Sequence, residues 1–368
     1  MSTMKSEEAI ITATIDYEQW VKKHVAVADA DLQRKHEEMA TSLFAFLRAT
    51  FYRWASLWSE VCPGLAKTPK VLAVGDLHVE NFGTWRDGEG RLVWGVNDFD
   101  EVSRMPYTVD LTRLTTSAIL AKRENGLAID PNDAATAVLE GYTEFLQEGG
   151  NPFILEESHP NLRCMALGAE RDPTRFWNKL LGLPRVSPPK AIRRLLKQSL
   201  PRGAQDISFS HRIAGVGSLG RPRYLATALC DGGLAAREAK AWLPSAWGWA
   251  AGRQKDHAYS NRLLNRAVRQ LDPYYALEKG WIVRRIGPHC ERIELAQFPQ
   301  LRDERRILKD MGRETANLHL ATRHQRIEIL RDLTERKADW LVNAAHAMSK
   351  ATEQDWEAFR SSRLASRT

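Results

Sequence analysis

The sequence contains few cysteines, and the four that it has are widely separated, with no Cys-x-x-Cys pair among them. This spacing argues against a zinc site or a disulfide framework and favours reduced, buried thiols. No apolar run approaches membrane-spanning length, and the N-terminal segment has no apolar signal core. We therefore expect a cytoplasmic protein without a membrane partner.

Internal repeats and low-complexity segments are absent from the sequence as well. With 43% hydrophobic and 27% charged residues, the composition argues against a disordered or fibrous chain. A length of 368 residues suffices for one large domain or two lobes around a sizeable core. The net charge of +7 and the pI of about 9.2 are compatible with an anionic partner, although we do not expect a nucleic acid.

Acidic residues are missing from one long stretch, residues 173–205, which we call the basic segment. The simpler interpretation is a solvated basic helix face, and the alternative is a docking surface for an anionic acceptor. The segment carries eight basic side chains: Arg175, Lys179, Arg185, Lys190, Arg193, Arg194, Lys197 and Arg202.

Hydrophobic periodicity predicts a mostly helical first half that is interrupted by one small sheet motif. The expected helices cover residues 15–61, 109–148 and 174–199. The expected strands cover residues 70–74, 82–85 and 91–97. A tight turn at residues 87–90 joins the last two strands, and its Asp87-Gly88 pair suits a hairpin.

The second half is expected to begin with three strands in a meander over residues 205–242. A helix at 259–271, a strand pair at 280–286 and 291–298, and two helices at 303–323 and 325–350 follow. These elements predict an α+β fold with an antiparallel sheet. The predicted domain boundaries are 1–64, 65–204, 205–300 and 301–368.

Two acidic clusters, "GDLHVEN" at 75–81 and "VNDFDE" at 96–101, flank the predicted hairpin. In a first interpretation they form a phosphoryl-transfer site. Asp76 accepts the proton of an attacking hydroxyl, while Asn81 and Asp98 bind a metal that bridges to phosphates. Carboxylate and amide oxygens suit Mg²⁺, which is a hard cation.

Two other interpretations compete for the same clusters. The Asp76-x-His78 pair also resembles part of a dinuclear metallophosphoesterase site, but that class needs later His clusters, and the candidates "NLHLATRH" and "GPHC" match neither of them. Alternatively, the acids and amides cap turns or are solvated. The compatible spacing of three such residues around a hairpin argues against this last interpretation.

A glycine-rich motif in the second half favours phosphoryl transfer. "GVGSLG", with Gly215, Gly217, Ser218 and Gly220, lies between two predicted strands and not before a helix, which is typical of a flap over nucleotide phosphates. On the third strand, alternation puts Glu238 and Lys240 on one face and Arg237 on the other. An exposed cleft lysine at position 240 would meet the phosphates as a point charge.

These motifs resemble those of aminoglycoside-phosphotransferase-type kinases. "GDLHVEN" and "VNDFDE" resemble the catalytic loop and the metal-binding Asp, and "GVGSLG" with Lys240 resembles the Gly-rich loop and third-strand lysine. Their order is inverted, however, and "RRILKDMGRETANLHLATRH" near the C-terminus resembles the helix that usually leads into the catalytic loop. A circular permutation of a two-lobe kinase fold accounts for this order.

The whole pattern, including "SLFAFLRATFYRW", is similar to a bacterial family of uncharacterised proteins, domain of unknown function 2252, over residues 36–323. The kinase resemblance implies ATP and Mg²⁺ as cofactors. It also implies that Asp76 acts as the base or orients the hydroxyl, that Asn81 and Asp98 hold the metal, and that Lys240 binds phosphate. Asp110 resembles the helix Asp that supports the catalytic loop from below.

The sequence departs from the kinase pattern at several positions. Val74 replaces the usual His before the catalytic Asp, and Asp100 stands where protein kinases have Gly, so Asp100 is a further candidate metal ligand. The helix at 259–271 has no Glu to pair with Lys240; either Glu238 substitutes or the ion pair is absent. A non-catalytic, nucleotide-binding pseudokinase therefore stays an alternative. The acceptor, a small molecule or a protein hydroxyl, is left open, as is nucleotidyl rather than phosphoryl transfer.

Overall fold

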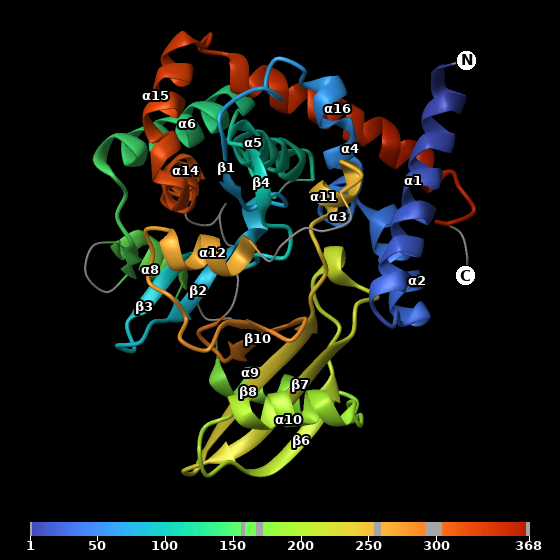
Figure 1. The fold of residues 1–368 in the computed structure, drawn as a ribbon, viewed down its shortest axis with the longest axis vertical. Coiled ribbons are helices and arrows are strands. Elements are labelled where there is room, and N and C mark those ends of the chain that lie inside the picture. Colours follow the sequence, from blue (N-terminus) through green and yellow to red (C-terminus); the bar gives the residue numbers. More distant parts are fainter. Residues whose placement is uncertain are drawn as a thin grey trace.

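The computed structural model describes residues 2–124, 126–155, 159–166, 172–253, 259–290 and 304–365. Most of its helices gather in one large body, from which a five-stranded antiparallel sheet projects (Figure 1). The chain is thus of mixed α+β class with antiparallel sheets, as the sequence predicts. No helix among the described residues is long and apolar enough to cross a membrane.

The N-terminal part of the body consists of helices whose apolar residues recur at intervals of three and four. Ser42 separates two of them and caps the second one, since its Oγ accepts a hydrogen bond of 2.9 Å from the Ala45 amide. These helices are α1 (Ser2–His24), α2 (Asp29–Thr41), α3 (Leu43–Ala49) and α4 (Phe51–Val61). The long α16 (Trp340–Arg360) packs across them from the other end of the chain (Figure 1).

The centre of the body is a group of closely packed helices: α5 (Thr108–Arg123), α6 (Pro131–Glu148) and α14 (Glu304–His319). Helices α6 and α14 touch through two glycines. A Cβ on Gly141 would lie 1.9 Å from the carbonyl oxygen of Lys309, and one on Gly312 would lie 2.1 Å from that of Val138. The two backbones can approach this closely because neither glycine has a side chain. After α14 come a 3₁₀ segment, η5 (Leu320–Gln325), and α15 (Arg326–Glu335).

Two small sheets lie beside these helices. One pairs β1 (Lys70–Ala73) with β4 (Ser103–Pro106), and the other contains β2 (Phe82–Arg86), β3 (Leu92–Val96) and β5 (Phe153–Ile154). The predicted hairpin is thus present, and Asp87 closes its turn by accepting from the Glu89 and Arg91 amides. Strands β4 and β5 were not predicted, because runs of two to four residues carry too little periodicity.

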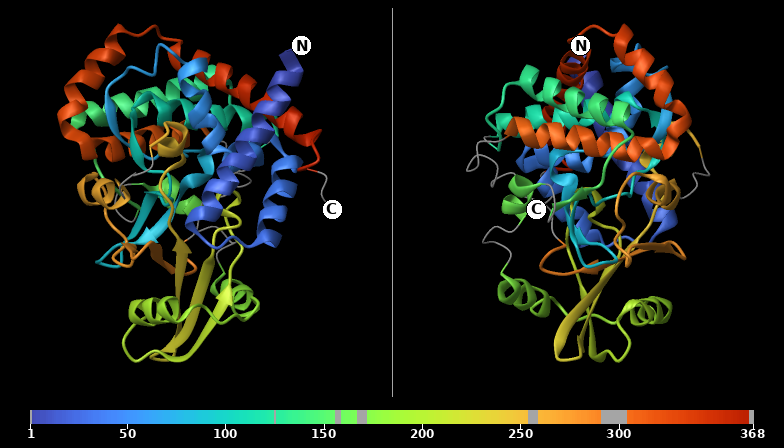
Figure 2. Two further views of the ribbon diagram at one scale, coloured as in Figure 1. Left: turned by 45° about the vertical axis from the view of Figure 1, so that its right-hand side comes forward. Right: turned by 90° about the vertical axis from the view of Figure 1, so that its left-hand side faces the viewer.

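The projecting sheet has the strand order β6-β7-β8-β10-β9, and a helix covers each of its faces (Figure 2). Its strands are β6 (Gln205–His211), β7 (Arg223–Cys230), β8 (Gly233–Ala241), β9 (Ala276–Glu278) and β10 (Trp281–Ile286). Helix α9 (Pro173–Leu181) packs Phe176 and Leu180 on one face. Helix α10 (Lys190–Ser199) packs Ile192 and Leu196 on the other.

The structure divides the predicted helix at 174–199 into α9 and α10, because the prolines at 184, 188 and 189 cannot continue a helix. The predicted boundary at residue 205 separates these two helices from the sheet that they cover. Of the predicted strand pair, the first is β10, and the second, at 291–298, lies outside the described residues. The remaining short helices are α8 (Pro160–Ala166), α11 (Ala246–Ala250) and α12 (Tyr259–Arg266).

Candidate active site

A cavity of about 650 Å³ lies between the helical body and the projecting sheet. It brings together the first acidic cluster, the second acidic cluster and the Gly-rich loop, which are far apart in the sequence. The residues that line it and that the sequence singled out are Asp76, His78, Asn81, Asp98, Asp100, Arg175, Lys179, Gly215, Gly217 and Ser218.

The loop that follows β1 is held in place from beneath by Asp110. The two carboxylate oxygens of Asp110 accept hydrogen bonds from the amides of Val74 (2.7 Å) and Gly75 (2.8 Å), and its Oδ2 also lies 3.0 Å from Nε2 of His319. Gly75 has φ of +85°, and a Cβ there would clash with the Glu101 backbone, so the sharp turn requires glycine. This is the supporting geometry that the resemblance implies for Asp110.

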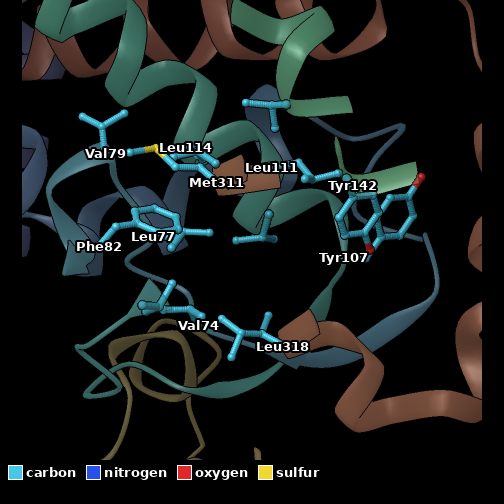
Figure 3. Packing of buried hydrophobic residues seen from close by; sticks show 14 of the residues in the cluster. Val74, Leu77, Val79, Phe82, Tyr107, Leu111, Leu114, Tyr142, Met311 and Leu318 are labelled. Atoms are coloured by element: carbon cyan, nitrogen blue, oxygen red, sulfur yellow. The ribbon is translucent and has the colours of Figure 1, made fainter. Parts of the chain in front are cut away.

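Apolar residues of the same loop anchor it in the core. Val74, Leu77 and Val79 are fully buried among side chains of α5 and α14, including Leu114 and Met311 (Figure 3). The polar residues that alternate with them are thereby turned toward the cavity. The loop is therefore a rigid support for Asp76, rather than a mobile surface turn.

Asp76 is paired with an arginine that the sequence motifs did not indicate. Nε of Arg113 donates to Asp76 Oδ1 at 2.8 Å, and Nη2 of Arg113 donates to the Leu47 carbonyl at 2.6 Å. Arg113 is fully buried, with its guanidinium over the ring of Trp54. Burial raises the pKa of Asp76, and the positive charge of Arg113 opposes this effect. Arg113 lies one helical turn after Asp110 in "VDLTRL", and that spacing is the one sequence signal for it.

Asn81 contacts the cavity, but its amide oxygen already has a partner inside the loop. Oδ1 of Asn81 accepts from the His78 amide at 2.7 Å, and Nδ1 of His78 accepts from the Glu80 amide at 3.2 Å. Together these bonds close a capping box around η1 (Val79–Asn81). The oxygen of Asn81 thus retains one lone pair for a metal ion.

Asp98 and Asp100 line the cavity and contact Lys240, which is buried and is not among the described residues that line it. Nζ of Lys240 lies 2.6 Å from Oδ1 of Asp100 and 3.5 Å from Oδ1 of Asp98. Burial raises the pKa of Asp98, but the charges of Lys240 and Arg284 outweigh this and hold it below its usual range. Burial and the neighbouring charge of Asp98 raise the pKa of Asp100. The Asp98 side chain is 42% exposed, so it is open to a ligand.

Glu238 does not pair with Lys240, although the two side chains share a face of β8 as predicted. Within the described residues, the fully buried Glu238 binds three arginines, and Lys240 binds Asp98 and Asp100. Glu238 accepts from Nη1 of Arg223 at 3.1 Å and from Nε of Arg284 at 2.9 Å, and it is also ion-paired with Arg212. Burial alone would raise the pKa of Glu238, but these three charges hold it well below its usual range.

The Gly-rich loop contains a short 3₁₀ turn, η3 (Val216–Ser218), that packs against α2 and α3. A Cβ on Gly217 would lie 2.7 Å from the Arg48 carbonyl oxygen and 3.7 Å from Oδ2 of Asp76. The amide of Ser218 donates to the carbonyl of Gly215 within the loop, and its Oγ accepts from Arg223 at 2.6 Å. The loop therefore lies beside Asp76, with part of its backbone bonded internally.

The basic segment is divided between the two faces of the sheet. Arg175 and Lys179, on α9, are exposed and line the cavity. Arg193 and Arg194, on α10, are exposed on the opposite face and do not line it. The solvated-face interpretation therefore describes α10, whereas α9 presents its charges to the cavity.

The histidine clusters of the phosphoesterase interpretation do not converge on the acidic loop. His319, of "NLHLATRH", is fully buried, with its ring bonded to Asp110 and to the hydroxyl of Tyr142. In the part of the chain that the structure describes, no group of three or more His, Cys, Asp or Glu side chains could hold a metal ion. A magnesium site here would therefore depend on Asp98 together with the amide oxygen of Asn81.

Comparison of the chain with curated proteins and with solved structures gave no match. A family model, described as an uncharacterized protein conserved in bacteria (DUF2252), matches residues 28–172. The matched range contains both acidic clusters, Asp110 and Arg113. The family resemblance predicted over residues 36–323 is thereby confirmed as far as residue 172, whereas the likeness to kinases stays a prediction. Over residues 28–172 the chain is therefore similar to this bacterial family of uncharacterized proteins.

Proposed function

We propose that the protein is an ATP-dependent phosphotransferase that transfers a phosphoryl group to a hydroxyl acceptor with the help of Mg²⁺. Asp76 would orient the acceptor hydroxyl and accept its proton. Asp98 and Asn81 would hold the metal, and Lys240 would bind the phosphates. A bound magnesium ion would neutralise charge on the phosphate oxygens.

One observation carries this proposal. Asp98, Asp76 and Gly217 line one cavity, where Gly217 lies against Asp76, and the buried Lys240 lies 3.5 Å from Asp98 directly behind that lining. The cavity also has an apolar end, formed by residues such as Leu180 and Ile286, that suits a nucleotide base. A nucleotide could therefore place its base against the sheet and its phosphates between Lys240 and the acidic clusters.

The two-lobe, permuted kinase fold is part of the same proposal. The projecting sheet would be the small lobe, and the helical body with both acidic clusters would be the large lobe. In support, α14 contacts β1, although the two segments come from opposite ends of the chain. A cut between α14 and β1 would turn the usual kinase order into the order seen here.

Calorimetric titration with ATP, with and without Mg²⁺, tests the proposal when it is combined with a turnover assay for ADP. We expect metal-dependent ATP binding and acceptor-dependent release of ADP. Hydrolysis of p-nitrophenyl phosphate without any nucleotide, and no binding of ATP, would instead support the dinuclear hydrolase.

A nucleotide-binding pseudokinase is the second candidate, and one specific observation favours it. Two of the three acids of the second cluster, Asp98 and Asp100, contact Lys240, and the Asn81 oxygen accepts a bond within its own loop. Both features would need to rearrange before a metal and phosphates could bind together. ATP binding that is independent of Mg²⁺ and accompanied by no turnover would identify the pseudokinase.

A further inference from the structure

The cationic side chains of the cavity differ in one respect, namely whether a carboxylate already neutralises them. Among the described residues that line it, seven are Arg or Lys and five are Asp or Glu. Arg48 pairs with Glu80 at 2.6 Å, and Arg221 contacts Glu101 at 3.4 Å. Arg223 and Arg284 on the sheet, and Arg212 directly after β6, all pair with Glu238.

Arg175 and Lys179 are the exception. Within the described residues, neither forms an ion pair or a hydrogen bond through its side chain, and both are exposed at the cavity. They are four positions apart on α9, so their side chains lie on the same face of the helix, one turn from each other. The neighbouring Phe176 and Leu180 anchor α9 on the sheet and thereby fix this face at the cavity.

Two adjacent like charges repel each other, and an anion between them relieves this repulsion. The same cavity contains Asp76, which is the proposed hydroxyl-orienting group. We infer that Arg175 and Lys179 bind an anionic group, phosphate or carboxylate, on the acceptor whose hydroxyl meets Asp76. This inference rests on the proposed function and narrows its substrate to an anionic alcohol, which argues against a polycationic aminocyclitol.

Helix α10 offers a matched control. Arg193 and Lys197 have the same spacing and exposure, belong to the same basic segment, and lie on the other face of the sheet. The test compares R175Q/K179Q with R193Q/K197Q, since each variant loses two positive charges from an exposed helix face. Circular dichroism checks that both variants fold as the wild type does.

The first measurement is calorimetric titration of inorganic phosphate, on the nucleotide-free protein and on protein saturated with Mg²⁺ and a non-hydrolysable ATP analogue. We expect R175Q/K179Q to bind phosphate roughly tenfold more weakly, because two charge-assisted contacts are lost. The control variant should bind like the wild type. Equal phosphate affinity in R175Q/K179Q and the wild type, or no phosphate binding to the wild type, would overturn the inference.

The second measurement compares turnover of glycerol with glycerol 3-phosphate and of glucose with glucose 6-phosphate. The charged member of a pair should be preferred by the wild type and the control, and this preference should disappear in R175Q/K179Q. Preference for the neutral alcohols, or for a cationic aminocyclitol, would contradict the inference. If neither the wild type nor the variants bind the nucleotide analogue, the proposed function is wrong. The phosphate titration of the nucleotide-free protein still shows whether Arg175 and Lys179 bind an anion.

Discussion

Lys240 and Asp98 are 142 positions apart in the chain, yet Nζ of one lies 3.5 Å from Oδ1 of the other. Lys240 comes from the sheet and Asp98 from the helical body, so this contact joins the two parts beside the cavity that Asp98 lines. The Asp98 side chain is 42% exposed whereas that of Lys240 is 4% exposed. A ligand that enters the cavity would therefore reach the carboxylate first and compete for the lysine.

Replacing Lys240 should affect both stability and nucleotide binding. An exposed cleft lysine would contribute little, but Lys240 is buried, and Lys240→Ala removes the cation that contacts both Asp98 and Asp100. We expect the free energy of unfolding to fall by on the order of 1–3 kcal/mol and ATP affinity to fall with it. Urea denaturation and calorimetry measure the two effects.

The matched control for this variant is Lys279→Ala, which removes an exposed lysine next to the same sheet. Its unfolding free energy should stay within about 0.5 kcal/mol of the wild type. Unchanged ATP affinity in Lys240→Ala would exclude Lys240 as the phosphate lysine. Arg237 would not replace it, because Arg237 lies on the other face, bonded to the Ser199 carbonyl.

Asp76 and Asp98 should respond differently to the same chemical change. Asp76→Asn removes the proton acceptor and leaves the proposed metal ligands intact, so Mg²⁺-dependent ATP binding should persist while turnover falls by roughly 10²–10⁴. Asp98→Asn removes a charged ligand, so metal-dependent ATP binding should weaken together with turnover. Metal content and ATP affinity, measured by calorimetry, separate the two outcomes.

The dinuclear alternative predicts the opposite pattern. Asp76 and His78 would then both be metal ligands, and Asp76→Asn or His78→Ala would each remove metal from the protein. Metal loss in these two variants, with Asp98→Asn unaffected, would contradict the assignment. Asn81→Ala should resemble a milder Asp98→Asn, because an amide oxygen binds Mg²⁺ less strongly than a carboxylate does.

Local patterns were enough to predict much of the fold and many candidate residues. The hairpin from Phe82 to Val96 and the meander from Gln205 follow from alternation and from the turn residues between the strands. The resemblance also indicated Asp110 as a support of the loop, and its bonds to Val74 and Gly75 have that geometry.

The parts that could not be predicted depend on contacts between distant segments. In the sequence, Arg113 is an ordinary polar position of a predicted helix. Its ion pair with Asp76 forms because the loop that contains Asp76 packs against this helix. The division of the basic segment between cavity and solvent depends on which face of the sheet each helix covers. The preference of Glu238 for three arginines depends on β7, β10 and the residue that follows β6 together. Sequence patterns describe single elements, and these pairings are set by packing.

The cluster around Glu238 predicts a pH-dependent stability. The folded state lowers the pKa of Glu238, so the cluster contributes stability that is complete above the usual Glu value of about 4.3. This contribution should decrease as the pH falls below that value and through the lowered pKa. Glu238→Gln, which leaves three arginines without their buried partner, should cost about 3–5 kcal/mol at neutral pH.

Urea denaturation of the wild type and Glu238→Gln between pH 8 and the acid range, at about half-unit steps, measures this difference. The gap between the two unfolding free energies should be constant near neutrality and narrow below about pH 4.3. A gap that widens on acidification would contradict the lowered pKa. A Glu278→Gln variant, which removes an exposed acid from the same sheet, should show no comparable gap.

The position of Gly217 predicts that a single added methyl group weakens ATP binding with little effect on the free energy of unfolding. A Cβ at Gly217 would lie 2.7 Å from the Arg48 carbonyl, which is backbone and cannot yield as a flexible side chain would. In Gly217→Ala we therefore expect the loop to move away from α3 and from Asp76, because the loop is the less constrained of the two partners. ATP affinity should fall by roughly tenfold, while the free energy of unfolding changes by no more than about 1–2 kcal/mol.

Gly88→Ala, where a Cβ would meet nothing within 4 Å, is the matched control and should leave ATP affinity unchanged. If Gly217→Ala binds ATP as tightly as the wild type does, the Gly-rich loop does not contact the nucleotide, and its glycines serve packing against α3 instead.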